Sequence, residues 1–542
     1  MSGWQLLLLL VAGEPSVAAP PHLEGATALA AKIDECVERH WRTIGVRPAE
    51  PADDVTFLRR ATLDLAGRIP TRREAQSFAQ DASADKRARA VRRLLTGPEF
   101  ALHFANVLDD AIQASRSGDG DFLAWLRDSL QARRPWDQMF REVLLGPWDT
   151  PDSKRAERFL ARRLANIDEL TNDTSRAFFG VDVSCAKCHD HPLVDDWKQD
   201  HYFGLSSFFC RTYEFKGKDK ERRIGEKDAG EIEFVTRLGE KRKAQLMFLS
   251  GQIVVEPPVC DDQRLKEQQE QAKNEGTYLP PAFSRREQLV RVALEQRTMI
   301  SRSFVNRLWA YFLGRGLVEP VDQMHSANPP AVPGVLELLA DDLAGNGYAV
   351  ERLVAAICTS RVYALASHWP YPGTKPAPEQ FALAPLRPLS PKQMAASLVL
   401  ATGDDSFENS SDVALDRTAE GAAWAERHKQ LESRGSEFVA WLDPRSDAFQ
   451  SSTGEALFMS NHPAVQRLLQ PDGRNLAARL AESTDETQFT ELAAWTVFGR
   501  RPVAEELALC HDWCARHAAD RATACRDLLW AMVTSAEFRF NH

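Results

Sequence analysis

Residues 63–70 read LDLAGRIP and residues 495–502 read WTVFGRRP, so an apolar stretch that ends in Gly-Arg and a proline occurs near both ends of the chain. An acidic residue follows four positions after each proline, at Glu74 and at Glu506. The two ends therefore predict related helical hairpins, and this duplication favours an all-α architecture over an α/β enzyme fold. The matching later segments are LLTGPEF at residues 94–100, LL at 528–529 with TSAEF at 534–538, and, more weakly, CTSRVY at 358–363.

Helical spacing of apolar residues extends over most of the chain. Phe57, Leu58, Ala61 and Leu65 share one face of a predicted helix. Further helices are expected over residues 121–133 and 154–179, and again from residue 285 onward. Thr71 and Glu74 have the spacing of a capping box at a helix start. We expect a mostly all-α, irregular multi-helix architecture with duplicated helical hairpins.

The pattern changes between residues 211 and 284. Short β-branched runs at residues 232–235 and 253–255 predict a small β hairpin inserted near the middle of the chain. Residues 216–227 form a dense run of alternating basic and acidic side chains. Such alternation is typical of a solvated loop rather than of a phosphate-binding patch.

Composition excludes several classes of protein. The 542 residues are 44% hydrophobic and 27% charged, which is typical of a globular chain of several domains and excludes a disordered or collagen-like one. The net charge of −10, from 67 basic and 77 acidic residues, provides no general basic field for nucleic acid. Gly-rich phosphate loops and the HExxH and GxSxG motifs are absent from the sequence, so no convincing catalytic constellation is found and enzymatic activity stays open.

The first residues have the pattern of an export signal. Residues 6–11 are an apolar run, and the small residues Val17, Ala18 and Ala19 suit a signal-peptidase site, although no Lys or Arg precedes the run. We expect a signal peptide over residues 1–19 and a secreted or periplasmic mature chain. Elsewhere no stretch approaches the ~20 apolar residues of a spanning helix, so we expect no membrane span in the mature chain.

One motif carries chemistry. Cys185-Ala186-Lys187-Cys188-His189 is a CxxCH sequence, the attachment signature of c-type haem. Thiols at i and i+3 on one helical turn reach the two vinyl groups of one porphyrin, and the next residue places an imidazole under the iron. Thioether attachment occurs outside the cytoplasm, so the signal-like N-terminus and the motif support each other.

Two other uses of the motif stay open. A zinc site would use Cys185, Cys188, His189 and His191, completed by a distant residue such as His201, Cys210 or Cys260. A structural disulfide between Cys185 and Cys188 is the other alternative. Asp190 and His191 are further positioned to orient His189 or a haem propionate.

The segment around this motif resembles a known family. Residues 178–192 read FFGVDVSCAKCHDHP, followed by Trp197, Asp200 and Tyr202, and this run is similar to the planctomycete secreted cytochrome-like domain of unknown function. Downstream, the sequence resembles the companion planctomycete secreted domain, also of unknown function. The segments that carry this second likeness are FVNRLW at residues 304–309, GRGLVEPVD at 314–322 and SANPP at 326–330.

The resemblance implies secretion and one covalent haem c held by Cys185 and Cys188, with His189 as the proximal iron ligand. It implies no established reaction. His201 departs from the aromatic residue usual in the family. The distal ligand stays open among six residues, which are Met247, Met299, Met324, His103, His201 and His325.

Three of the other cysteines lie near the C-terminus. The nine cysteines are too few for a disulfide scaffold. Cys510 and Cys514 are one helical turn apart, and either reaches Cys525 if the last two helices pack antiparallel. A disulfide there is one hypothesis, and buried free thiols are the alternative.

These observations predict an order of segments. They are a signal peptide (1–19), a helical cytochrome-like domain with the CxxCH motif (27–212), a charged connector with a short β hairpin (213–284), a helical companion domain (285–368), a Pro-rich linker (369–391) and the C-terminal helical part of the companion domain (392–542).

The expected function is that of an exported c-type cytochrome-like protein, with a single covalent haem, in electron transfer or as the redox centre of a surface complex. Its partners would be a redox partner or other exported proteins, and no nucleic acid. The alternative is a secreted binding or scaffold protein in which the motif forms a structural metal site or disulfide.

Overall fold

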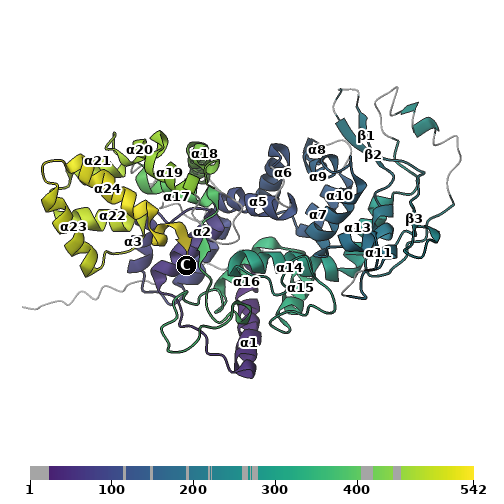
Figure 1. Ribbon diagram of the computed structural model, residues 1–542, viewed down its shortest axis with the longest axis horizontal. Coiled ribbons are helices and arrows are strands. Elements are labelled where there is room, and N and C mark those ends of the chain that lie inside the picture. The colour runs from purple at the N-terminus through teal and green to yellow at the C-terminus, as the bar shows by residue number, and fades with distance from the viewer. Residues whose placement is uncertain are drawn as a thin grey trace, which may run out of the picture.

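The computed structural model describes residues 23–542, except for the segments 114–117, 147–150, 191–193, 218–219, 221, 259–265, 269, 272–278, 404–418 and 443–452. The expected signal peptide, His191 and Cys260 lie outside the described residues. The described chain is mostly helical, and its strands form small two-stranded sheets, as the sequence predicts (Figure 1). Among the described residues, no helix has both the length and the apolar character needed to cross a membrane.

The helices before the CxxCH motif begin with a long amphipathic helix that projects from the body in Figure 1. They are α1 (Ala26–Ile44), α2 (Asp54–Ala66), α3 (Arg72–Gln80), α4 (Lys86–Thr96), α5 (Pro98–Gln113), α6 (Gly120–Gln131), α7 (Trp136–Leu145), α8 (Pro151–Ala156), α9 (Arg158–Ala161), α10 (Ile167–Thr174) and the π-helix η2 (Ser175–Phe179). The motif follows in the 3-10 helix η3 (Ser184–Lys187), before α11 (Gln199–Ser207).

Three antiparallel strand pairs complete the middle and the end of the chain. They are β1 (Thr212–Lys216) with β2 (Arg222–Glu226), β3 (Glu233–Val235) with β4 (Lys241–Lys243), and β5 (Arg387–Pro388) with β6 (Phe540–Asn541). The later helices are α13 (Arg285–Gln296), α14 (Thr298–Leu313), α15 (Val335–Gly345), α16 (Val350–Thr359), η5 (Pro378–Gln380), α17 (Pro391–Thr402), α18 (Ala419–Val439), α19 (Thr453–Asn461), α20 (Pro463–Leu469), α21 (Leu476–Glu482), α22 (Glu486–Val497), α23 (Ala504–Arg516), α24 (Arg521–Thr534) and α25 (Ala536–Arg539).

Two hydrophobic cores organise these helices. The first runs through α1–α16 and includes Phe178, Tyr202, Trp309 and Tyr363, so the cytochrome-like and companion segments pack on shared buried residues. The second joins α17–α25 to Leu63 of α2. The N-terminal hairpin thus lies against the C-terminal helices, and Figure 1 shows α3 on the same side as α22 and α23.

The predicted duplication is present in the structure at atomic detail. Arg68 donates to Glu99 from Nε (2.7 Å) and Nη2 (2.8 Å) and to Glu74 from Nη1 (2.8 Å) and Nη2 (3.1 Å). Arg500 makes the corresponding bonds to Glu537 (2.6 and 2.7 Å) and to Glu506 (2.8 and 2.7 Å). The preceding glycines, Gly67 and Gly499, both have φ 72°, which lets each helix end in a left-handed residue.

The third copy, which begins at Gly314-Arg315 and ends at residues 358–363, repeats the left-handed glycine but not the pair of glutamates. Gly314 also ends its helix at φ 72° and is followed by Arg315, and Tyr363 is buried where the other copies have Phe100 and Phe538. Val362 occupies the position of Glu99 and Glu537 in this copy. An arginine bound to two glutamates is therefore found only in the first and last copies.

Local predictions near the first copy are confirmed. Thr71 and Glu74 form the expected capping box, in which each side chain receives the other residue's backbone N–H.

Three expectations are wrong in detail. The helix expected over residues 154–179 is divided among α8, α9, α10 and η2. Part of the charge run at residues 216–227, expected to be a solvated loop, forms β2, where Ile224 and Glu226 are each 1% exposed. The buried Glu226 carboxylate accepts hydrogen bonds from Ser284 and from the backbone of Arg285. Residues 253–255 contribute one isolated bridge, Ile253 to Met247, instead of a strand.

Candidate functional site

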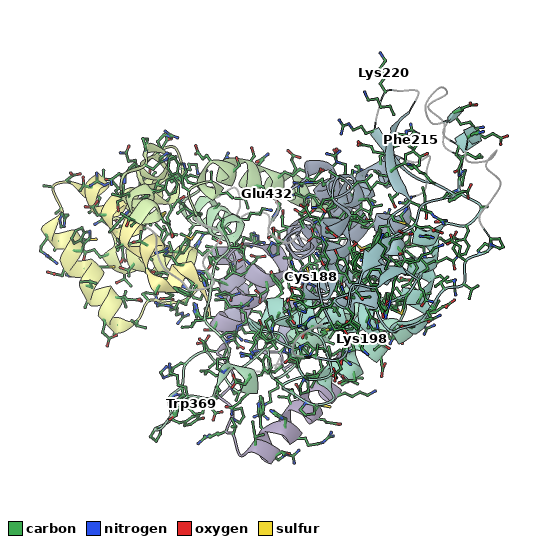
Figure 2. The ribbon with its side chains drawn as sticks, turned by 45° about the vertical axis from the view of Figure 1, so that its right-hand side comes forward. Cys188, Lys198, Phe215, Lys220, Trp369 and Glu432 are labelled. Carbon is green, nitrogen blue, oxygen red and sulfur yellow. The ribbon has the colours of Figure 1, made fainter. Side chains whose placement is uncertain are left out.

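The CxxCH motif lies on a single tight turn. The Cys188 N–H donates to the Cys185 carbonyl (3.4 Å), and the 3-10 helix η3 provides the turn between them. Residues at i and i+3 eclipse one another in a 3-10 helix, so the two cysteines share one face of the turn. Both are exposed free thiols, and Ala186 between them is fully buried. Figure 2 labels Cys188 together with Lys198, which precedes α11.

The turn before the motif is held by backbone contacts to residues 322–323 and by an ion pair with Arg176. The Asp182 backbone N–H donates to the Asp322 carbonyl (2.7 Å), and an isolated bridge joins Val181 to Gln323. Arg176 pairs with the Asp182 carboxylate (2.5 Å), which also accepts the Ser184 N–H (2.9 Å). The companion segment therefore fixes the direction in which the chain enters the motif.

Asp168 ties the motif to its neighbouring helices. Its carboxylate accepts hydrogen bonds from Lys187 of the motif and from the Tyr202 hydroxyl on α11. Burial raises the pKa of Asp168, but the bonds from Lys187 and Tyr202 outweigh this and leave it lowered. Sequence spacing gave no sign of this residue, because Asp168 is on α10 and its partners are distant in the chain.

His189 is held in one tautomer. Its Nδ1 lies 2.7 Å from the Asp190 carbonyl oxygen. A carbonyl oxygen only accepts, so Nδ1 carries the proton and the neutral ring presents the Nε2 lone pair. Asp190 in turn accepts the Gln199 N–H (3.0 Å), which joins the end of the motif to the start of α11. Asp190 thus orients His189 through its backbone, whereas its carboxylate binds α11.

The donor set fits a c-type haem. Two free thiols on one face of a turn suit thioether bonds to one porphyrin, and an Nε2 lone pair suits an iron ligand. For the zinc alternative, the described residues contain no group of three or more His, Cys, Asp or Glu side chains placed to hold a metal ion. His191, which that alternative uses, is outside the described residues.

Four of the six distal-ligand candidates lie beside segments that flank the motif. Met247 packs on Gly204 of α11, and Met324 lies against Gly180, to whose carbonyl its N–H donates (3.1 Å). His201 and His325 both interact electrostatically with Asp196. The His201 Nδ1 accepts the Lys198 N–H (3.1 Å), so its Nε2 carries the proton in the neutral ring.

The other two candidates are placed differently. The His103 Nε2 lies 2.9 Å from the Tyr311 hydroxyl, in the interior between α5 and α14, and its ring fills the space against Gly67. Burial lowers the pKa of His103 to about 3. Met299 is half-buried in the first turn of α14. Of the three methionines, Met247 and Met324 are buried beside Gly204 and Gly180.

Cys510, Cys514 and Cys525 are buried free thiols in the structure. Cys514 interacts electrostatically with both of the others. The structure shows no bond among them, and the disulfide stays a prediction.

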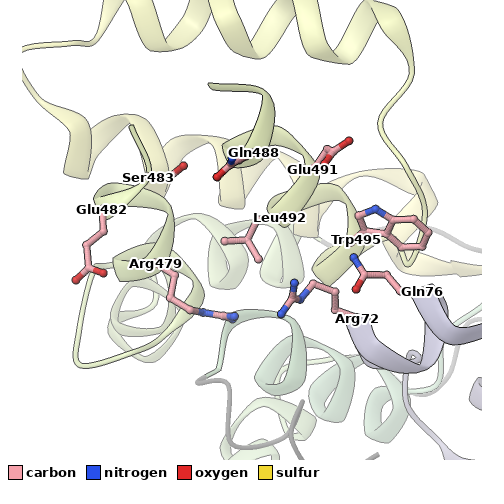
Figure 3. A pocket seen from close by; sticks show the side chains of 9 residues that line it. All are labelled: Arg72, Gln76, Arg479, Glu482, Ser483, Gln488, Glu491, Leu492 and Trp495. Atoms are coloured by element: carbon pink, nitrogen blue, oxygen red, sulfur yellow. The ribbon is translucent and has the colours of Figure 1, made fainter. Parts of the chain in front are cut away.

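A polar groove lies where the first and last repeat copies meet. A cavity of ≈ 450 Å³ lies between α3 and the helices α21 and α22, and an adjoining cavity of ≈ 580 Å³ shares Gln76, Glu491 and Trp495 with it. Figure 3 shows Arg72 and Arg479 reaching toward one another from the two sides, with Trp495 beside Gln76.

The comparisons with known proteins identify both halves of the chain. Residues 32–214 match the family PSCyt2, described as a protein of unknown function (DUF1549), and residues 285–514 match PSD1, described as a protein of unknown function (DUF1553). The chain therefore contains a segment that matches each of these two families, in this order. No curated protein and no solved structure matches the chain. The CxxCH motif is inside the PSCyt2 segment, and its Asp322 support comes from the PSD1 segment.

Proposed function

We propose that this PSCyt2–PSD1 chain is an exported c-type cytochrome-like protein with a single covalent haem, active in electron transfer or as the redox centre of a surface complex. The observation that carries the proposal is the geometry of one turn: two exposed free thiols on a common face, followed by an imidazole that presents Nε2. Cys185 and Cys188 would hold the haem, and His189 would be the proximal ligand. The haem would supply a one-electron couple.

The chain's own residues set the environment of that couple. The hydrogen bond from His189 Nδ1 to the Asp190 carbonyl fixes the ring orientation and makes Nε2 more basic. Lys187, between the two cysteines, has its charge balanced by Asp168. Exposure of the thiols puts the site at the protein surface, where a redox partner comes close to it without a channel through the protein.

The proposal is tested by expressing the exported chain with a haem-attachment system. We expect haem to stay bound through denaturation and to map to the peptide that holds Cys185 and Cys188. His189→Ala should keep the thioether bonds and change the visible spectrum, because it removes only the iron ligand. Haem that is lost on denaturation, or that maps to another peptide, would contradict the proposal.

A second candidate is a binding or scaffold protein with a structural motif. The polar groove between α3 and α22 favours it, because a tryptophan, glutamates, glutamines and arginines line one open cavity. In that case the chain stays colourless, and substitution of both motif cysteines lowers the stability of the fold. Stability measurements on the colourless protein therefore separate this candidate from the first.

A further inference from the structure

A largely apolar cavity of ≈ 310 Å³ lies among α5, α7, η2 and α14, apart from the CxxCH turn. Trp136 and Phe304 stack at its side with ring centroids 4.2 Å apart and planes inclined by 19°. Ala177 of the π-helix η2 also lines it, and short π-helical segments often mark functional sites. The volume is at the lower end of the range for small-molecule sites, which is ~300–1,000 Å³.

Two hydrogen-bond donors at this cavity lack an acceptor among the described residues. Arg307 donates from Nη2 to the Arg176 carbonyl, whereas its buried Nε–H has no acceptor among the described residues. The buried indole Nε1–H of Trp136 has none either. Tyr311, also in the lining, already bonds the Asp64 carbonyl and His103. An occupant that satisfies this cavity must therefore accept hydrogen bonds.

The charge of the lining residues also favours an occupant that accepts hydrogen bonds. Arg307 is the one charged side chain among the described lining residues. Burial lowers the pKa of Arg307, and the nearby Asp322 offsets this in part. Asp322 is also 3.7 Å from Arg176, so its negative charge is shared between two arginines. A single, incompletely balanced guanidinium suits a planar monoanion better than a phosphate dianion, which needs more than one cation.

We propose that this cavity is a binding site for a small amphipathic carboxylate, with its apolar body against Trp136 and Phe304 and its carboxylate on Arg307. The site is independent of the haem proposal, since it uses none of the motif residues. The apolar lining excludes strongly hydrated ligands, and the arginine distinguishes an acid from its neutral analogue.

Isothermal titration calorimetry on the full chain tests this with benzoate, phenylacetate and hexanoate, each beside its neutral alcohol or amide. A hydrogen bond to a charged group contributes ~1.5–3 kcal/mol, so an acid should bind roughly tenfold to a hundredfold more tightly than its neutral analogue. Arg307→Gln should remove that preference. Equal binding of acid and neutral analogue, or no binding of any of the three acids, would overturn the proposal.

Two further variants keep the test informative if Arg307→Gln does not fold. Trp136→Phe keeps an aromatic ring at this position and removes the Nε1–H donor together with part of the indole surface, and it should weaken acid binding at least roughly fivefold, the value of one neutral hydrogen bond. Ala111→Leu fills the cavity from α5 and should abolish binding. Arg302→Gln, which removes a half-exposed arginine of the same helix paired with Glu337, is the matched control and should bind as the parent does. Unchanged acid binding in both Trp136→Phe and Ala111→Leu would place the ligand elsewhere.

Discussion

Arg68 and Arg500 occupy equivalent positions in the first and last repeat copies, and each holds two glutamates through the same atoms. The environments differ. The Arg68 side chain is 1% exposed, with Glu74 at 7%, whereas the Arg500 side chain is 23% exposed, with Glu506 at 34%. The same arginine–glutamate network is therefore buried in the first copy and partly exposed in the last copy.

Replacing the arginines should reveal that difference in depth. Arg68→Met removes the guanidinium that both buried carboxylates, Glu74 and Glu99, share, which we expect to cost about 3–5 kcal/mol of unfolding free energy. Arg500→Met should cost less, about 1–3 kcal/mol, because water reaches its glutamates. Chemical denaturation measures both. The exposed Arg501→Met is the control, expected within about 0.5 kcal/mol of the parent. Equal losses at Arg68 and Arg500 would contradict the account.

Acid should destabilise the chain through the Arg68 network. Burial raises the pKa of Glu74, but Arg68 outweighs it and holds the pKa at about 2, below the ordinary 4.5. The stabilisation is complete above pH 4.5 and is lost as the pH falls from 4.5 toward 2, by roughly 3 kcal/mol. Unfolding free energies measured across this range should show that slope. Glu74→Gln removes the titrating group, so a slope that persists unchanged in this variant would refute the assignment.

Thiol reactivity should separate the motif from the core. In the haem-free chain, Cys185 and Cys188 are exposed and should be the first to react with N-ethylmaleimide. Cys358 and Cys525 are fully buried, and burial raises the pKa of Cys525 to about 11, so both should react only after unfolding. Peptide mass mapping over time reports the order. Early modification of Cys358 would show that the first core opens more readily than this packing implies.

The C-terminal cysteines make a pairing prediction. Cys525 interacts electrostatically with Cys514, so mild oxidation should join Cys514 to Cys525. Cys510→Ala should leave this bond intact and Cys514→Ala should abolish it, as read from peptides under non-reducing conditions. A bond between Cys510 and Cys525 in the parent chain would contradict the arrangement of α23 and α24.

Features with a local or repeated signature were predictable from the sequence. The capping box at Thr71 and the duplicated Gly-Arg segments depend on short spacings, and the structure shows both. Glu74 and Glu99, which bind Arg68, were recognisable in the sequence as repeated residues. That both bind one guanidinium depends on the packing of α2, α3 and α5. The β1–β2 hairpin was missed because partners far along the chain, at Ser284 and Arg285, bury the Glu226 carboxylate.

In the candidate site, too, only part of the arrangement was predictable from the sequence. The CxxCH spacing identified the thiols and the imidazole, whereas the contacts of Asp168 and of the Asp190 carbonyl with them required the three-dimensional structure. The orphaned donors of Arg307 and Trp136 also had no sequence signature, because an acceptor is absent only after packing has placed every neighbour.

The most direct test of the central claim is a pyridine haemochrome spectrum with metal analysis. The samples are the parent chain expressed with a haem-attachment system, the Cys185→Ala, Cys188→Ala double variant, and Cys36→Ala, which removes a half-buried thiol of α1. The account predicts one haem per chain with the reduced spectrum of a double-thioether haem in the parent and in Cys36→Ala, and none in the double variant. A colourless parent chain, or haem retained by the double variant, would contradict it.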